Sequence, residues 1–286
     1  MTIGIIFGIL ASFSMGLSLV FIKKSYKEFP ASIAFAFQTV FGILLWIPFV
    51  LIIGIESKFI LTVLLVAFLS AILSEAFYYY IFQKADVGMT GVVFSTYPLF
   101  TIIFSFLLLN EKLSYALTLF VLLIIIGIVI LSMPDKIKRV SDKKKAIFWG
   151  LLGAGAVGLS DTISKGIIDK TSMPTFLFSL AIMQIPVAII FLKKQNEKLS
   201  QFSRIFSEIQ KYKYAIMGAF LGTVAVLFLW LTFEKTYASI ASPLTSAYPL
   251  FTLLLAYVWL KEKLSLKDWA GCFFIIIGVL GLGILI

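Results

Sequence analysis

Two carboxylates, Glu75 and Asp161, lie well inside long apolar stretches of this chain. A charged carboxylate at the centre of a membrane helix costs about 3 kcal/mol on insertion scales, so such a group usually faces an interior cavity. Tyr78 and Tyr79 follow Glu75 by three and four residues and would share its side of a helix. A carboxylate beside aromatic rings suits an amine or another cation, and a buried carboxylate can also carry a coupling proton. For Glu75 the alternative is a hydrogen-bonded structural acid.

Other polar side chains also occur in apolar stretches. Lys165 follows Asp161 by four residues, which favours a local ion pair on one helix face, and the alternative is proton or ion coupling at Asp161. Gln38 and Gln184 place one amide in each half of the chain. Either amide could line a cavity or hold neighbouring helices together by hydrogen bonds.

A repeated pair of motifs relates the two halves of the chain. YPLFT at residues 97–101 recurs at 248–252, and EKLS at 111–114 recurs at 262–265, both 151 positions later. Apolar stretches resemble one another by chance, but two such identities in one register indicate a duplicated unit.

The repeat adds one aromatic residue to the candidate site. At the offset of 151 positions Tyr79 corresponds to Trp230, so each half carries an aromatic side chain at this place. The predicted substrate-binding residues are therefore Glu75, Tyr78, Tyr79, Trp230, Gln38 and Gln184, and Glu75 or Asp161 is predicted to couple a proton or an ion.

The repeated motif also carries a proline inside an apolar stretch of each half. Pro98 and Pro249 each remove one helical hydrogen bond and free the carbonyl four residues earlier, on Phe94 and Thr245. In lipid such a carbonyl must find another partner or face a wet cavity. Interrupted helices at matching positions of two repeats point to the central site of a transporter, so both prolines are predicted to be hinge or gating positions. The alternative is a tolerated kink that only shapes packing.

Composition indicates which elements must position these residues. The chain has 286 residues, is 61% hydrophobic and 13% charged, and so has the composition of an integral membrane protein. A helix that crosses the hydrocarbon needs about 20 apolar residues. Ten stretches approach or exceed this length, at residues 3–22, 32–54, 59–82, 88–109, 115–132, 146–167, 174–192, 213–232, 239–260 and 267–285. Their continuous apolar runs favour helices over the alternating strands of a barrel.

The ten predicted spans divide into two repeats of five. The predicted units are residues 1–132, a basic linker at 133–145 and residues 146–286. Because five is odd, the second unit must enter the membrane from the opposite side, which predicts an all-α protein of two inverted five-helix repeats around a central cavity. In the second unit, apolar and basic residues at about 196–213 predict an amphipathic helix in the membrane interface.

Basic residues predict the orientation of the chain. The loops after spans 1, 3, 5, 7 and 9, counted with the first residue of the following span, carry 19 Lys and Arg. The loops after the even-numbered spans, counted with Lys165 near the end of span 6, carry five. The positive-inside rule places the first set in the cytoplasm and both termini outside, in a plasma or inner cell membrane. The apolar stretch Met1–Val20 lacks a basic leading segment and is predicted to be retained as a span. The net charge of +10 sits between apolar segments and favours an anionic membrane face over nucleic acid.

Small residues recur every fourth position near the start of each repeat. They are Gly8, Ser12 and Gly16 in the first unit, and Gly150, Ala154 and Gly158 in the second. Such stripes let helix backbones approach closely, so these residues are predicted to serve helix packing.

Three further sets of residues are predicted to be structural. The EKLS turns, with Glu111 and Glu262, are predicted to be structural and to end in helix caps, at Ser114 and at Ser265 with Asp268. The tryptophans near span ends are predicted to form an interfacial belt, namely Trp46, Trp149, Trp259 and Trp269.

Residues of soluble-enzyme chemistry are missing from the sequence. Histidine is absent, and the one cysteine, Cys272, lies in an apolar stretch. A P-loop, a His–Cys metal cluster or a Ser-His-Asp set therefore cannot be assembled. We predict a protein that is not an enzyme, holds no cofactor or metal, and needs no ATPase partner.

These features resemble the EamA unit of the drug/metabolite transporter superfamily. Each repeat opens with a small-residue span followed by a lysine, at Lys23 and Lys165, and carries the YPLFT proline and the EKLS turn; Ala85 follows an aromatic span end. The resemblance implies ten helices, inverted repeats and alternating access to a central cavity. Members of the superfamily export amino acids and other metabolites, and distant relatives carry nucleotide sugars or sugar phosphates. Relatives often have cytoplasmic termini, whereas the basic residues here predict termini outside.

The sequence therefore predicts a secondary transporter that moves a small polar or amphipathic metabolite, such as an amino acid, outward across a lipid bilayer. The alternatives are an exporter of aromatic cations or drugs, a nucleotide-sugar or sugar-phosphate carrier, and a membrane scaffold that transports nothing. An intramembrane enzyme would need a nucleophile and a base within the spans, and the sequence offers no such pair.

Overall fold

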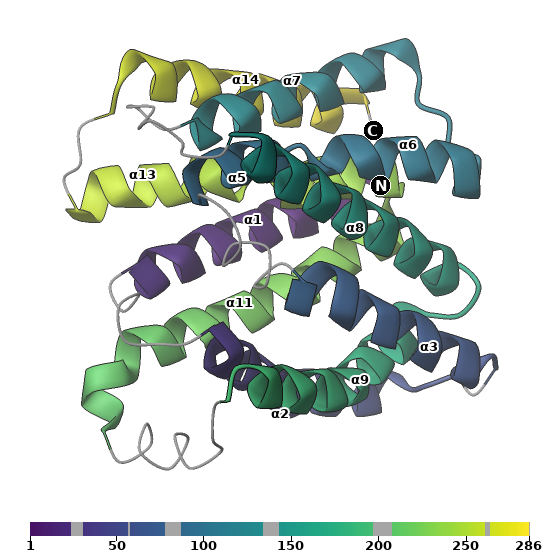
Figure 1. Ribbon diagram of the computed structural model, residues 1–286. Helices are drawn as coiled ribbons and strands as arrows, with labels where there is room; N and C mark the ends of the chain where they lie inside the picture. The colour runs from purple at the N-terminus through teal and green to yellow at the C-terminus, as the bar shows by residue number, and fades with distance from the viewer. Residues whose placement is uncertain are drawn as a thin grey trace.

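The computed structural model describes residues 1–23, 31–56, 58–77, 87–133, 143–196, 208–260 and 264–285 (Figure 1). Nearly all of these residues are helical, and no strand occurs among them. Within them, nine helical stretches are long and apolar enough to cross a membrane, and a shorter apolar helix covers Ile60–Ser74. The predicted all-α membrane architecture is confirmed.

The helices follow the predicted spans closely. In the first half they are α1 Thr2–Lys23, α2 Ala31–Ile53, α3 Ile60–Ser70 continuing into the π-helix η1 Ala71–Ala76, α5 Val87–Phe94, α6 Tyr97–Leu109 and α7 Tyr115–Ser132. In the second half they are α8 Lys143–Ile168, α9 Met173–Lys194, α11 Ile209–Lys235, α12 Ala238–Thr245, α13 Tyr248–Leu260 and α14 Leu266–Leu285. Two predicted spans, 88–109 and 239–260, are each divided into a short and a long helix.

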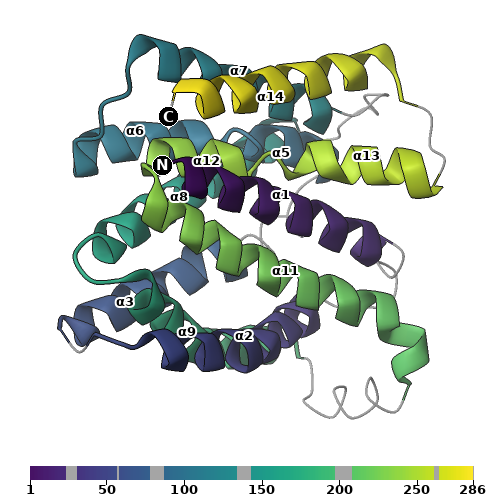
Figure 2. The ribbon, with the colours of Figure 1, turned by 180° about the vertical axis from the view of Figure 1, so that it is seen from behind.

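Corresponding helices of the two halves run in opposite directions. Figures 1 and 2 show this for α7 and α14, which pack side by side, and for α6 and α13. Both chain ends lie on the same side of the bundle, where α1 begins and α14 ends. If the bundle spans a membrane along these helices, both termini face one compartment.

Each divided span is broken directly before the repeated Tyr-Pro pair. Ser95 and Thr96 separate α5 from α6, and Ser246 and Ala247 separate α12 from α13. Each proline is thus the second residue of the following helix, where its missing N–H leaves no helical hydrogen bond unmade. The interruption is present in both halves, as a break at a helix start and not as a kink within one helix.

Each half packs its first helix against the broken span of the other half. On α1, Gly16 lies against α13, and a Cβ added there would meet the Cβ of Phe251 at 2.8 Å. On α8, Gly158 lies against α6, and an added Cβ would meet the Cβ of Phe100 at 2.6 Å. Phe100 and Phe251 are 151 positions apart, so the two contacts are equivalent in the repeat. A second equivalent pair of close approaches joins Gly8 to Leu244 and Gly150 to Val93.

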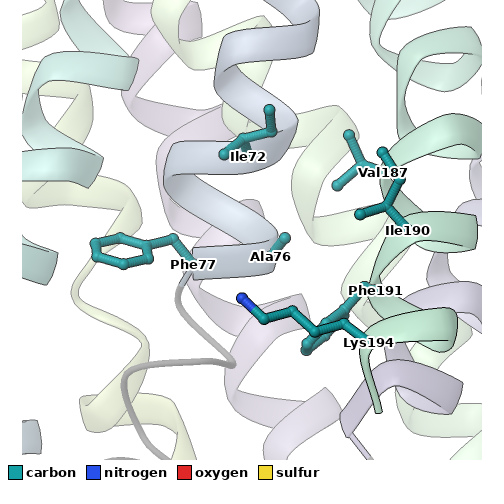
Figure 3. A pocket seen from close by; sticks show the side chains of 7 residues that line it. All are labelled: Ile72, Ala76, Phe77, Val187, Ile190, Phe191 and Lys194. Atoms are coloured by element: carbon teal, nitrogen blue, oxygen red, sulfur yellow. The ribbon is translucent and has the colours of Figure 1, made fainter. Parts of the chain in front are cut away.

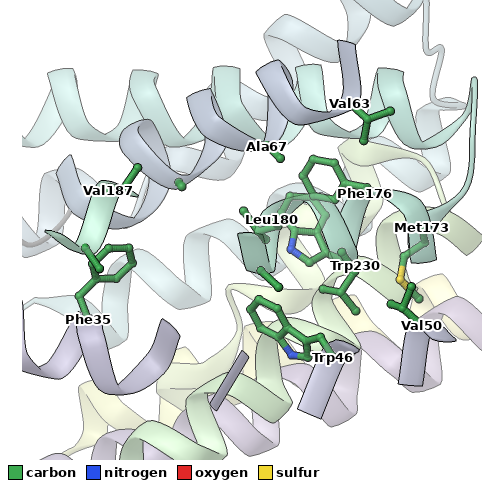
Figure 4. Close-up of a cluster of buried hydrophobic side chains, with 14 of the residues drawn as sticks. Phe35, Trp46, Val50, Val63, Ala67, Met173, Phe176, Leu180, Val187 and Trp230 are labelled. Carbon is green, nitrogen blue, oxygen red and sulfur yellow. The ribbon is translucent and has the colours of Figure 1, made fainter. Parts of the chain in front are cut away.

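The larger apolar core lies between α2, α3, α9 and α11, and Figure 4 shows Trp46, Phe176 and Trp230 within it. The prediction that Trp46 belongs to an interfacial belt is wrong, because its ring is fully buried. Gly42, one turn earlier, leaves room for that ring, and the indole Nε1 of Trp46 donates to the carbonyl of Thr223 at 3.1 Å. The other tryptophans of the predicted belt are half-buried or exposed: Trp149, Trp259 and Trp269.

The predicted helix caps are confirmed. At the start of α7, Ser114 Oγ accepts a hydrogen bond from the N–H of Leu117 at 3.3 Å. At the start of α14, the N–H of Ser265 donates to Asp268 Oδ2 at 2.8 Å, and the N–H of Asp268 donates to Ser265 Oγ at 3.3 Å. Glu262 lies outside the described residues.

Two predicted connecting segments fall mostly outside the described residues. Of the predicted interfacial helix at about 196–213, residues 196 and 208–213 are described, and 209–213 form the start of α11 without a break from the span. Of the predicted linker at 133–145, the described end at 143–145 is the start of α8.

Candidate functional site

The predicted substrate-binding residues fall into two groups. Tyr78 and Tyr79 lie outside the described residues, and Glu75 is described only by its backbone, in η1. Trp230, Gln184 and Gln38 lie on α11, α9 and α2. A π-helical turn contains about one residue more than an α-helical turn, and such turns are frequent at functional sites. The π-helix η1 carries Glu75.

Trp230 and Gln184 lie inside the packed helix bundle. Trp230 is buried between aromatic rings, with ring centroids 4.7 Å from Phe176 and 5.3 Å from Phe233. Gln184 is fully buried, and a Cβ added to Gly42 would lie 3.4 Å from its Oε1. Gln38 is half-buried on α2. None of these three predicted residues lines the two cavities at the ends of α9.

The first of these cavities, of about 320 Å³, lies between η1 and the end of α9 (Figure 3). Its lining residues are Ile72, Ala76, Phe77, Val187, Ile190, Phe191 and Lys194. Apart from Lys194 they are apolar, and Figure 3 shows the ammonium end of Lys194 directed toward Ala76 and Phe77. The cavity therefore suits a molecule with an apolar part and an anionic group.

The second cavity, of about 330 Å³, lies at the start of α9, where α2 and α11 end. Its lining residues are Ile53, Gly54, Ile55, Glu56, Ser172, Pro174 and Glu234. The connection after α2 is held here because the N–H of Glu56 donates to Thr175 Oγ1 at 2.9 Å. Its two carboxylates suit a cationic group. Because α9 has 22 residues, the two cavities are separated by roughly 30 Å along the helix.

Asp161 lies at the meeting point of three helices, α8, α6 and α12. Its side chain is buried, and its Oδ2 accepts hydrogen bonds from Ser242 Oγ at 3.2 Å and Thr101 Oγ1 at 3.4 Å. The two hydroxyl oxygens are themselves 3.0 Å apart. Thr101 belongs to the first half and Ser242 to the second, so this polar cluster joins the two halves inside the bundle.

The predicted ion pair between Asp161 and Lys165 is wrong. Lys165 Nζ lies 2.6 Å from Asp169 Oδ1, one turn further toward the helix end. The helix spacing allowed either partner, and the lysine side chain pairs with the acid that is half exposed rather than with the acid held by Thr101 and Ser242.

The residue before Asp161 connects the same helix to η1. Ser160 Oγ donates to Ser70 Oγ at 3.0 Å and to Ser74 Oγ at 3.2 Å. Ser74 Oγ also donates to the carbonyl of Ser70 at 2.7 Å, across the junction of α3 and η1. Consecutive residues of α8 thus contact η1 on one side and the broken spans on the other.

Backbone carbonyls at both breaks are satisfied by hydroxyl groups. Ser95 Oγ and Thr96 Oγ1 donate to the carbonyls of Val92 and Val93 at 2.7 and 2.6 Å. At the second break, Ser12 Oγ on α1 donates to the carbonyl of Thr245 at 3.2 Å and to that of Leu244. Ser12, predicted as a small packing residue, therefore also caps the broken helix of the other half.

Sequence reasoning missed the hydroxyl partners of Asp161 and Ser160. Ser70 and Ser74 are four residues apart in an apolar stretch, a spacing that could have marked them as one polar face. Thr101 is part of the repeated YPLFT motif, but Ser242 corresponds to Gly91 in the repeat, so no pattern singled it out.

Both halves of the chain resemble one family of known proteins. The model of the EamA-like transporter family matches twice, at residues 2–133 and 144–284. An uncharacterised transporter of Archaeoglobus fulgidus is 20% identical over 90% of both chains. The uncharacterised transporter YcxC of Bacillus subtilis is 22% identical over 96% of this chain and 90% of its own.

Two further similarities concern one half and the whole fold. An uncharacterised protein of Methanocaldococcus jannaschii is 32% identical over 139 residues, which are 49% of this chain and 96% of that protein. A crystal structure with a TM-score of 0.72 covers 99% of this chain and 96% of its own at 17% identity, which shows the fold alone. Because the family model matches both halves, this chain belongs to the EamA-like transporter family of the drug/metabolite transporter superfamily and is a multi-pass membrane transporter.

Proposed function

We propose that this protein is a secondary transporter that exports a small amphipathic metabolite of the amino-acid type by alternating access between two inverted repeats. The observation that carries the proposal is the pair of matching helix breaks before Tyr97 and Tyr248, each packed against the first helix of the other half. A motion of one half against the other would bend the chain at both breaks together.

The breaks are suited to bending inside a membrane. Hydroxyl groups of Ser95, Thr96 and Ser12 already satisfy carbonyls next to the breaks. A broken helix with satisfied carbonyls does not expose unpaired backbone groups to lipid, which would cost several kcal/mol per group. Pro98 and Pro249 keep the following helices from merging with the preceding ones, because they supply no N–H to a continuous helix.

The cavities at the two ends of α9 support an amphipathic substrate. Lys194 at the first cavity would attract the carboxylate of the substrate. Glu56 and Glu234 at the second cavity, roughly 30 Å away, would attract its amino group at a different step of its passage. The apolar lining of the first cavity offers contact for a side chain of the substrate. Glu75 on η1, and Tyr78 and Tyr79 three and four residues later in the sequence, remain proposed binding residues.

A second candidate is export of lipophilic aromatic cations. The carboxylates of Glu56 and Glu234 favour it, and the ammonium of Lys194 at the first cavity disfavours it. Substrate profiles separate the two candidates directly.

The test is counterflow into proteoliposomes that hold the purified protein. Liposomes loaded with unlabelled leucine, phenylalanine or threonine should accumulate the same labelled amino acid above protein-free liposomes. Accumulation of a lipophilic cation but of no amino acid would favour the second candidate, and accumulation of neither would contradict both.

A separate variant tests the role of Glu75. Glu75→Gln should lower the initial rate of counterflow or change its dependence on pH, because the carboxylate is proposed to bind the substrate amine or a proton. Glu208→Gln, at the start of α11 and outside both cavities, serves as the comparison for a general effect of lost charge. Unchanged rate and pH dependence in Glu75→Gln would remove Glu75 from the proposed site.

A further inference from the structure

Asp161 is a buried carboxylate without a basic partner among the described residues. Its nearest lysine on α8, Lys165, is paired with Asp169 at 2.6 Å. The neighbouring helices α5, α6 and α12 contain no Asp, Glu, Lys or Arg at all. An ionised carboxylate in such a place is costly because only neutral hydroxyls compensate its charge.

The charged groups on the other elements around α8 lie away from Asp161. Lys193 and Lys194 are at the far end of α9, and Glu234 and Lys235 at the end of α11 are 2.9 Å from each other. On η1 the acid is Glu75, which is described only by its backbone. The hydroxyl groups that bond to Ser160 of α8 are those of Ser70, at the end of α3, and Ser74, on η1.

The hydroxyls of Thr101 and Ser242 can serve both protonation states of Asp161. A hydroxyl donates its proton to an ionised carboxylate, and its lone pairs accept a proton from a neutral carboxylic acid. With oxygen–oxygen distances of 3.2 and 3.4 Å to Oδ2, both hydroxyls are in place for either arrangement. Binding and release of one proton therefore leave the cluster hydrogen-bonded.

The same geometry argues against a metal ion. Four side-chain oxygens meet here, two from the carboxylate of Asp161 and one each from Thr101 and Ser242. Hard cations take larger sets of oxygen ligands, about six to eight for Ca²⁺. A proton needs one carboxylate oxygen and one acceptor, and the cluster supplies both.

The location links this proton to motion between the halves. Asp161 lies one turn after Gly158, where α8 packs closely against Phe100 and Thr101 of α6. Its hydroxyl partners come from α6 of the first half and α12 of the second, the helices on either side of the breaks. Charge on Asp161 strengthens the hydrogen bonds across this contact, and its neutralisation weakens them.

We propose that Asp161 is the binding site of the coupling proton, and that Thr101 and Ser242 are the residues that position it between the two halves. The proposal rests on the transport function proposed above. In each cycle the carboxylate would take up one proton from one side of the membrane, become a neutral acid, and release the same proton on the other side.

The first test needs no substrate, because the probe is the proton itself. Infrared difference spectra of the reconstituted protein across a pH series should show the C=O stretch of one protonated carboxylic acid, absent in Asp161→Asn. Glu208→Gln, at the start of α11, should keep the band. Thr101→Val and Ser242→Ala should change the pH at which the band disappears, whereas Ser105→Ala, one turn away on α6, should not. Identical spectra in the wild type and Asp161→Asn would overturn the proposal.

The second test measures coupling. Labelled leucine is the probe, and initial rates are compared with and without a pH gradient across the proteoliposome membrane. The ratio of the two rates should exceed unity in the wild type and in Glu208→Gln, and fall to unity in Asp161→Asn. A wild-type response to a sodium gradient and not to a pH gradient would overturn the proposal. Absence of any leucine transport would instead count against the proposed function, and the infrared titration would still decide proton binding.

Discussion

Gly158 and Gly155 lie one turn apart on α8 and differ in what surrounds them. A Cβ added at Gly158 would lie 2.6 Å from the Cβ of Phe100 and 2.7 Å from the backbone N of Thr101, whereas one added at Gly155 would meet nothing closer than 3.9 Å. Gly158→Ala should therefore lower the free energy of unfolding by roughly 1–3 kcal/mol, as overpacking does. Gly155→Ala should be neutral or slightly stabilising, because alanine favours helix.

Thermal unfolding of the two variants in the same detergent checks this pair. A lower midpoint for Gly158→Ala alone is the expected result. Equal midpoints would mean that α8 and α6 are not in contact at this residue in the detergent-solubilised protein.

At the residue scale, the spacing of residues in the sequence predicted where side chains lie on a helix better than it predicted which groups they bond to. The four-residue spacing of Asp161 and Lys165 allowed an ion pair, but a helix offers each side chain partners in both directions and on neighbouring helices, and Asp169 is the partner of Lys165. Ser12 could be recognised as small, but its bonds to the carbonyls of Leu244 and Thr245 depend on tertiary packing.

The short helix α12 is held at its start by a residue of the other half. Glu111, in the turn after α6, is buried, and its carboxylate accepts hydrogen bonds from the N–H of Ala238 at 2.8 Å, the N–H of Ser239 at 3.0 Å and the hydroxyl of Ser239 at 2.6 Å. A carboxylate at a helix N-terminus is also favoured by the helix dipole.

Glu111→Ala should accordingly lower the free energy of unfolding by roughly 2–3 kcal/mol, since the start of α12 loses its charged partner. Glu56→Ala, which removes an exposed carboxylate at the end of α2, should change it by no more than about 0.5 kcal/mol. Midpoints of denaturant-induced unfolding measure both. A Glu111→Ala midpoint equal to that of the wild type would show that the three hydrogen bonds contribute nothing net.

At the element scale, hydrophobic length predicted nearly every helix. The span 115–132 coincides with α7, and the spans around α1, α2, α9 and α14 agree within two residues at each end. The proline in each YPLFT motif predicted an interruption, and the structure places it directly before the motif. The π-helical geometry of η1 could not be predicted, because AILSEA has no residue that distinguishes it from an α-helix.

At the scale of the whole molecule, the fold and the basic residues together predict the orientation of the chain in the membrane. The fold places both termini on one side, and the 19 Lys and Arg after the odd-numbered spans predict that this side is outside. Reporter proteins fused at residue 1 and at residue 286 should therefore both report the outer compartment, and a reporter inserted in the segment 134–142 should report the cytoplasm.

The reporter fusions could contradict these expectations in two ways, and the two outcomes have different meanings. Reporters at the two ends in different compartments would contradict the even number of crossings. Reporters both in the cytoplasm would leave the fold intact and contradict only the orientation inferred from basic residues.

The reciprocal packing of α1 and α8 sets the order of assembly during biosynthesis. Ser12 and its acceptor Leu244 are 232 positions apart, so the glycine stripe of α1 has no native partner when it leaves the ribosome. At a synthesis rate of about 5–20 residues per second, α1 waits on the order of 10–50 s in the bilayer before α12 is made. During that interval lipid, or an insertion factor, must cover Gly8 and Gly16, and the first half cannot complete its own maturation alone.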